Sequence, residues 1–322
     1  MAGVVRLLLA RPARLAVAWL ALVGLVAVLA PVLPLPYPPD VPDLNQMAAP
    51  PSSASPHWLG TDAQGRDVLS VLVFGARTAV LLTLPAAILA ALLGTVLGGA
   101  AGYWGNAARV PAYCGAVALG LLWWALALPY FIIGLSLSLA VAVVLALARR
   151  PRKLPLPINA LTMGLATALD TIPRLVLVLA IAAGTGVSKT GLLALLALTT
   201  WPHTARLVRA QMLRVRILPF VEAARASGLP AGRVWLLHAL PHAVQPLRTA
   251  FPRSLAGLLG LESTLSFLGV GLPPDVASWG RLLGNVRVAP EAWWTFVFPG
   301  ACLVLTILSL YALSRSSFRP PH

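Results

Sequence analysis

The feature that most constrains this chain is a series of apolar runs, most of them close to the length that crosses a bilayer. They cover about Leu15–Leu33, Thr78–Gly102, Thr167–Gly186, Leu192–Leu207, Leu255–Leu272 and Thr295–Leu313. A helix needs roughly 20 apolar residues to cross a hydrocarbon core of about 30 Å. Only 10% of the 322 residues are charged, against about 25% in an average soluble domain. The sequence therefore predicts an all-α, polytopic transmembrane helical bundle.

The charge balance of +15 is also a membrane feature. Arg and Lys lie in short clusters between the apolar runs, such as Arg149–Lys153. Cytoplasmic loops of membrane proteins carry this excess of basic residues. The distribution therefore predicts the lipid bilayer as a partner and argues against nucleic acid.

The N-terminal run resembles a signal peptide, because Arg6, Arg11 and Arg14 precede it. It is longer than the usual apolar region of about 7–15 residues, and the small residue Ala30 is followed by proline. We therefore expect residues 1–33 to form a retained transmembrane helix with a cytoplasmic N-terminus. Residues 34–77 would form an outer loop, and residues 78–322 the main transmembrane domain.

An additional apolar segment, 110–157, interrupts that domain. Its nearly uncharged part is broken at Pro129, and basic residues follow it. Both flanks are expected on the cytoplasmic side, so the segment should cross an even number of times, as a hairpin of about Pro111–Leu126 and Tyr130–Ala148. Each half is short for a full crossing, so a re-entrant pair stays an alternative. With about six further spans, the total is about eight crossings and both termini are cytoplasmic.

The outer segment His57–Arg77 follows a proline-rich stretch that should be extended. Thr61 or Asp62 can cap a short helix, which we expect to be amphipathic and to lie at the outer interface. The spacing of His57, Asp62 and Asp67 suits capping and turns better than a metal site, so no metal is predicted.

The inner loop Ile217–Ala243, within the segment 217–243, predicts a compact two-helix elbow. Pro219 suits the first turn of a helix, and Gly228 can adopt the left-handed conformation that ends one. Glu222 can pair with Arg225 three residues on. A second helix is expected to stop at Pro241, because proline disrupts a helix interior.

Two features inside the spans have more than one interpretation, and a third has a single one. Glu262 either lines a transport pathway or is held by an arginine or by hydroxyls such as that of Ser266, since acids in membranes usually find partners. Gly94, Gly98 and Gly102 fall four residues apart. Their shared helix face predicts either internal packing or a subunit contact. Asp170 and Arg174 are expected to pair on one helix face.

The elbow resembles the EAA loop of ABC importer permeases, which docks on the ATP-hydrolysing subunit in that family. The matching residues are Glu222, Ala223, Ala224, Gly228, Leu240 and Pro241. His238 replaces the usual aliphatic residue, as in the dipeptide/oligopeptide (nickel) branch of the family.

Two further segments resemble that branch, and in particular its second permease subunit. The outer signature, named here the GTD segment, comprises Gly60, Thr61, Asp62, Gly65, Arg66 and Asp67 and continues to Arg77. The other is ESTLSFLGVG, Glu262–Gly271, followed by Pro273 and the pair Ser278–Trp279. The family lacks an insertion such as 110–157.

The resemblance implies a type I ABC importer permease in the cell inner membrane. Its implied partners are a second permease, two cytoplasmic ATPases that bind the ATP, and an extracytoplasmic solute-binding protein. The chain has no Walker motif, so neither a cofactor of its own nor enzymatic activity is expected. The alternatives are an ion-coupled secondary transporter, which would use Glu262 but leave the elbow unexplained, and a membrane enzyme built on His57–Asp67.

Overall fold

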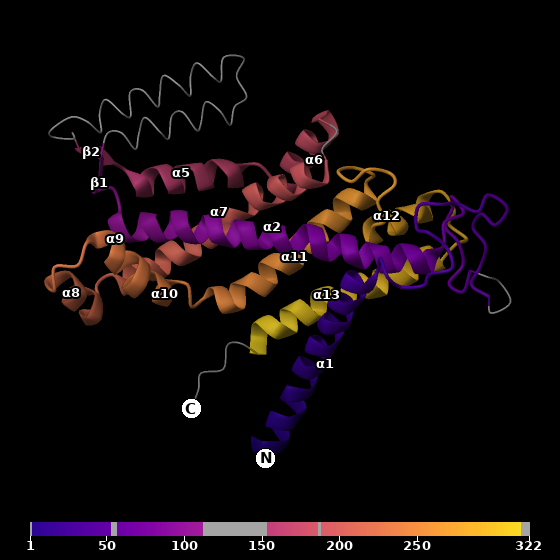
Figure 1. Ribbon diagram of the computed structural model, residues 1–322, viewed down its shortest axis with the longest axis horizontal. Helices are drawn as coiled ribbons and strands as arrows, with labels where there is room; N and C mark the ends of the chain where they lie inside the picture. The colour runs from indigo at the N-terminus through magenta and orange to yellow at the C-terminus, as the bar shows by residue number, and fades with distance from the viewer. Residues whose placement is uncertain (1, 53–56, 112–152, 186–187, 317–322) are drawn as a thin grey trace.

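The computed structural model describes residues 2–52, 57–111, 153–185 and 188–316, and is largely helical (Figure 1). The longer helices are α1 (Ala2–Leu29), α2 (Val68–Trp104), α5 (Ile158–Thr171), α6 (Arg174–Thr185), α7 (Lys189–Val215), α11 (Leu247–Phe267) and α13 (Trp294–Ser316). The shorter elements are α8 (Pro219–Ala226), α9 (Ala231–Arg233), the π-helical turn η1 (Val234–Ala239), α10 (Leu240–Ala243), α12 (Trp279–Gly284) and the 3-10 turn η2 (Asn285–Arg287).

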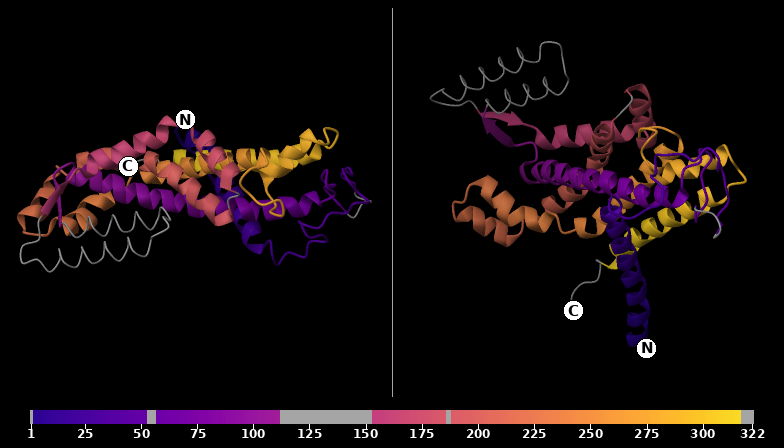
Figure 2. Two further views of the ribbon diagram at one scale, coloured as in Figure 1. Left: turned by 90° about the horizontal axis from the view of Figure 1, so that it is seen from above. Right: turned by 45° about the vertical axis from the view of Figure 1, so that its right-hand side comes forward.

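Helix α2 is the axis of the molecule. Its 37 residues correspond to about 55 Å at 1.5 Å per residue. It runs from the folded outer segment at one end to α8–α10 at the other (Figures 1 and 2). The expected short outer helix and the following span are therefore one continuous helix. It begins at Val68, because Asp67 caps it by accepting a hydrogen bond from the Ser70 amide at 2.8 Å.

Helix α7 packs along α2 over the predicted glycine face. A Cβ added to Gly94, Gly98 or Gly102 would lie under 3.0 Å from atoms of α7, including backbone atoms of Trp201, Ala205 or Arg209 in each case. Small residues allow two helix backbones to approach this closely. The face thus serves internal packing, one of the two interpretations that the sequence left open.

The expected span Thr167–Gly186 is not one continuous helix. Helix α5 ends at Thr171, α6 begins at Arg174, and the two are bent by 78°. Ile172 is extended (φ −95°, ψ 127°), as expected for a residue that precedes proline. Asp170 forms its ion pair with Arg206 of α7 instead of Arg174.

A short antiparallel ribbon is the exception to the all-α expectation. Strand β1 (Ala108–Pro111) pairs with β2 (Lys153–Leu156), with Ala108 opposite Leu156. The ribbon therefore brings the two ends of the predicted insertion 110–157 together beside the end of α2. The predicted hairpin itself, Pro111–Leu126 and Tyr130–Ala148, lies almost entirely outside the described residues.

Helices α1, α11 and α13 complete the bundle. Helix α1 crosses α13 and α2, and the Trp19 indole donates a hydrogen bond to the Thr306 hydroxyl at 3.0 Å. Within the described residues, α2 and most of α13 (Trp294–Arg315) are each long and apolar enough to cross a membrane, and the bent pair α5–α6 makes a third if it is one span. The count of about eight crossings stays a prediction.

Candidate functional site

The predicted elbow exists at the end of α2 that lies far from the GTD segment (Figure 1). Helix α8 begins with Pro219 and has Glu222 in its first turn. It ends at Ala226, and Gly228 has a φ of +77°. A residue with a Cβ rarely adopts this left-handed conformation, so Gly228 fixes the turn that separates α8 from α9.

The second helix of the elbow does not stop at Pro241, contrary to the prediction. It continues through α9, the π-helical turn η1 and α10 to Ala243. A π-helical turn shifts the hydrogen-bond pattern by one residue. Pro241 then lies at the start of α10, where a missing backbone N–H costs little.

The inner face of the elbow is anchored in a small apolar core. Val221, Val234, Ala239 and Ala243 are fully buried there. They pack with residues from the C-terminal ends of α2 and α7, namely Tyr103, Val208, Met212 and Val215. The elbow is therefore a packed extension of these two helices.

Aromatic contacts join the elbow to α2. The Arg225 guanidinium lies 5.0 Å from the centre of the Tyr103 ring and donates to the Tyr103 hydroxyl at 3.3 Å. Trp104 packs against Trp235 of η1 with ring centres 5.2 Å apart. Arg225 thus contacts Tyr103, and the predicted pair with Glu222 is absent from the ion pairs of the described residues.

The six predicted elbow residues divide between two surfaces. Glu222, Ala223, Gly228 and Pro241 are exposed, whereas Ala224 is buried and Leu240 half-buried. A Cβ added to Gly99 of α2 would lie 2.9 Å from Leu240 Cδ1. The elbow also exposes Ile217, Leu236 and Leu237, which are 66%, 53% and 60% exposed. Contiguous patches of exposed apolar side chains often mark a protein contact.

At the other end of α2, the first part of the GTD segment, Gly60–Asp67, folds as a buried turn, and its remainder, Val68–Arg77, forms the first turns of α2. Asp62 is fully buried. It accepts hydrogen bonds from the Arg66 amide at 2.9 Å, the Arg66 Nε at 2.8 Å and the Asn285 Nδ2 at 3.2 Å. Neither Thr61 nor Asp62 caps the helix, because Asp67 has that role.

The neighbours of Asp62 hold the proline-rich stretch in place. The Thr61 hydroxyl bonds to the Gln46 carbonyl, and the Thr61 carbonyl accepts from the Trp294 indole at 2.9 Å. Gly60 and Gly65 have φ values of +77° and +84°. A side chain at either would meet the backbone of Ala49 or Asp43. The signature residues therefore build the end of the fold that lies opposite the elbow.

His57 belongs to the same buried turn. It is 1% exposed, and its Nδ1 lies 3.0 Å from an Asp67 carboxylate oxygen, while its Nε2 lies 3.8 Å from Asp43. The ring packs on Tyr37 at 4.2 Å between centres. These contacts of His57 serve packing and helix capping. Asp62 does not take part in them, because its carboxylate binds Arg66 and Asn285 instead.

Glu262 lies in α11 and is 2% exposed. Its carboxylate accepts hydrogen bonds from the hydroxyls of Ser266 at 2.8 Å, Ser278 at 3.1 Å and Ser263 at 3.3 Å. The structure agrees with the interpretation that hydroxyl groups hold this acid. Because Ser278 also caps α12, Glu262 ties α11 to the start of α12.

Arg281 of α12 is a functional candidate that the sequence did not identify. Its guanidinium donates to the carbonyls of Leu272, Pro273, Pro274 and Val276 at 2.6–3.1 Å. Burial lowers the pKa of Arg281, and the nearby Arg66 charge adds to this, while Asp275 and Glu262 oppose it. The sequence could have indicated Arg281, because it is the single charged residue in the stretch 276–286.

Comparison with curated proteins gives relatives along almost the whole chain. A putative peptide permease protein of Brucella suis biovar 1 is 30% identical over 302 residues, covering 92% of this chain and 83% of the relative. The probable D,D-dipeptide transport system permease protein of Escherichia coli K12 is 27% identical over 271 residues, covering 84% and 74%.

A solved structure is also similar. It is an inward-facing form of the MetNI methionine ABC transporter, with a TM-score of 0.43 and 18% identity. The similarity covers 77% of this chain and 97% of the other.

A family model matches residues 138–319, more than half of the chain. Its description is binding-protein-dependent transport system inner membrane component. This match supports a permease subunit that does not itself hydrolyse ATP. It argues against an ion-coupled secondary transporter and against a membrane enzyme. The chain belongs to the family of inner membrane components of binding-protein-dependent transport systems.

Proposed function

We propose that this chain is one of two permease subunits of an ATP-driven importer of peptides. Two cytoplasmic ATPases would bind the ATP, and an extracytoplasmic solute-binding protein would deliver the solute. Two observations support the peptide assignment: relatives from Brucella suis and Escherichia coli are named as peptide and D,D-dipeptide permeases. The number of crossings, about eight, and two cytoplasmic termini belong to the same proposal.

The elbow is the observation that carries the proposal. One of its faces is locked to α2 and α7, and the other exposes Glu222, Ala223 and Gly228 beside large apolar side chains. Small residues leave room for a partner backbone to approach. We therefore assign this exposed face as the contact for an ATPase subunit.

The continuous helix α2 would transmit movement from the ATPase contact to the other end of the molecule. ATPase closure would displace the elbow, and the Tyr103–Arg225 and Trp104–Trp235 contacts would pass the displacement to α2. Because α2 extends to the outer turn, its tilt would change access at both ends. This is rigid-body switching through a coupling element.

Co-purification tests the proposal. The tagged chain, extracted from its native membranes in mild detergent, should bring down a second permease and ATPase subunits. Glu222→Arg should lose the ATPases because it reverses a charge in the contact. Gly228→Val should lose them because valine disfavours a φ of +77°.

The matched control is Gly164→Val. Gly164 is an exposed glycine of α5 with no atom within 4 Å of an added Cβ and no positive φ, so the ATPases should be retained. In both elbow variants the second permease should also be retained, which separates lost docking from misfolding. A chain that purifies alone under several detergents would contradict the proposed function.

A further inference from the structure

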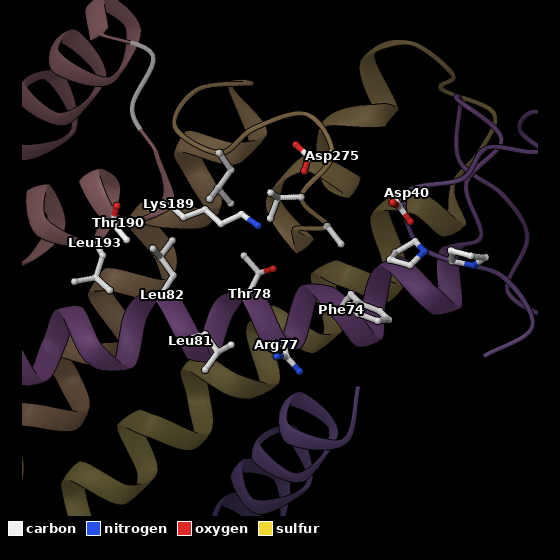
Figure 3. Close-up of a pocket in the computed structure, with 15 residues that line it drawn as sticks. Asp40, Phe74, Arg77, Thr78, Leu81, Leu82, Lys189, Thr190, Leu193 and Asp275 are labelled. Atoms are coloured by element: carbon white, nitrogen blue, oxygen red, sulfur yellow. The ribbon is translucent and has the colours of Figure 1, made fainter. Parts of the chain in front are cut away.

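A cavity of about 600 Å³ lies beside the outer half of α2 (Figure 3). Its walls come from α2, the first turns of α7, the loop 272–277 and the proline-rich stretch near Asp40. Small-molecule sites in proteins have volumes of about 300–1,000 Å³. The cavity therefore suits a small solute rather than a protein segment with its own core.

Two acids and two bases line this cavity: Asp40, Asp275, Arg77 and Lys189. None of the four takes part in the ion pairs within 4.0 Å found among the described residues. In Figure 3 the Lys189 side chain extends from the start of α7 into the cavity, and the Asp275 carboxylate lies on the opposite side of the opening. Lys189 and Asp275 thus bring charges of opposite sign to one space without forming an ion pair.

The loop that carries Asp275 is held in place before any solute arrives. Arg281 donates hydrogen bonds to four carbonyls of residues 272–276. Gly280 of α12 leaves no room for a side chain against the Ser263 backbone, so α12 is packed directly on α11. Groups fixed in this way lose little entropy on binding, which favours specific recognition.

We propose that the cavity is a solute site of the permease and that it recognises a short zwitterionic peptide. Lys189 would bind the terminal carboxylate and Asp275 the terminal ammonium, since charge-assisted hydrogen bonds are the strongest available to such a solute. Phe74, Leu82 and Leu193 would contact its side chains. A balanced set of two acids and two bases favours a zwitterion over a simple anion or cation. This inference rests on the proposed function.

The test uses cells whose own copy of the gene is deleted and which carry the wild-type chain or a variant. The probes are alanyl-X dipeptides, where X is each of the coded amino acids, and the matched dipeptide amides and N-acetyl dipeptides. Uptake of each probe is measured by mass spectrometry. The wild-type chain should import free dipeptides in preference to both blocked forms.

Each variant should lose one preference. Lys189→Gln should reduce the preference for a free carboxylate over an amide by about tenfold or more, as expected when a charge-assisted contact is lost. Lys189→Arg should retain this preference. Asp275→Asn should reduce the preference for a free amine over an acetylated one. Controls are Arg287→Gln and Glu291→Gln, which remove exposed charges between α12 and α13 that do not line the cavity.

Unchanged preferences in both Lys189→Gln and Asp275→Asn would overturn the assignment, as would a wild-type chain that imports no dipeptide or imports blocked forms equally well. Co-purification of the ATPases in the same strains would show that the proposed function stands even when the cavity assignment fails. A loss of both the ATPases and uptake in wild type would point to failure of the proposed function itself.

Discussion

At Glu262, three serine hydroxyls surround a carboxylate that is 2% exposed inside a predominantly apolar helix. An acid in this setting is costly unless it has partners. Two of the serines lie on the same helix, one and four residues further on, and the second of these, Ser266, was a candidate from the sequence alone. Ser278 lies 16 residues away, and only the packing of α12 on α11 brings it to the carboxylate.

Two replacements of Glu262 distinguish the effect of its charge on stability from the effect of its hydrogen bonds. We expect Glu262→Leu to lower the stability of the solubilised protein by about 1–3 kcal/mol, because the buried Ser278 hydroxyl loses its acceptor. Glu262→Gln, which keeps one carbonyl acceptor, should cost less. Thermal unfolding in mild detergent measures both, with the exposed Glu291→Leu as the control. Equal stability of Glu262→Leu and the wild type would contradict a structural role for the carboxylate.

Among the elements, the pairing of α2 with α7 depends on backbone approach rather than on side-chain burial. Gly94, Gly98 and Gly102 each bring α2 to the surface of α7. Their four-residue spacing indicated a shared face but not its partner. Whether this face packs against α7 or against another subunit depends on tertiary structure, because any helix with small residues can fit such a face.

Gly98→Val should therefore destabilise the α2–α7 contact. The added Cβ would overlap the Ala205 backbone, which cannot move as a flexible side chain can, and overpacking of this kind costs about 1–3 kcal/mol. Gly164→Val makes the same chemical change in open space. The difference between the two variants in thermal unfolding reports the packing alone. No difference would mean that the two helices do not pack as closely as the structure shows.

For the whole molecule, the elbow and the GTD turn lie at opposite ends of α2 (Figure 2). The elbow and the helix end before it are rich in arginine: Arg209, Arg214, Arg216, Arg225 and Arg233 lie there. The positive-inside rule predicts that this end faces the cytoplasm. The outer end would then face the compartment of the solute-binding protein.

Cysteine labelling tests this orientation. In a background of Cys114→Ser and Cys302→Ala, a membrane-impermeant maleimide should label Asn45→Cys on intact cells. Ser227→Cys should react only after the membrane is permeabilised. Both positions are exposed in the fold, so exposure alone should not separate them. The reverse pattern would mean that the proposed orientation is wrong.

The sequence by itself determined the membrane class, the long apolar helices α2 and α13, the elbow and the turn at Gly228, because hydropathy and backbone preference act over short stretches of chain. Tertiary structure decided the partners: Asp170 pairs with Arg206 and Arg225 with Tyr103, and Asp62 reaches Asn285. These contacts join residues 36 to 223 positions apart. Contacts between residues so far apart in the sequence depend on how the helices pack. The spacing of residues along one helix carries no information about them.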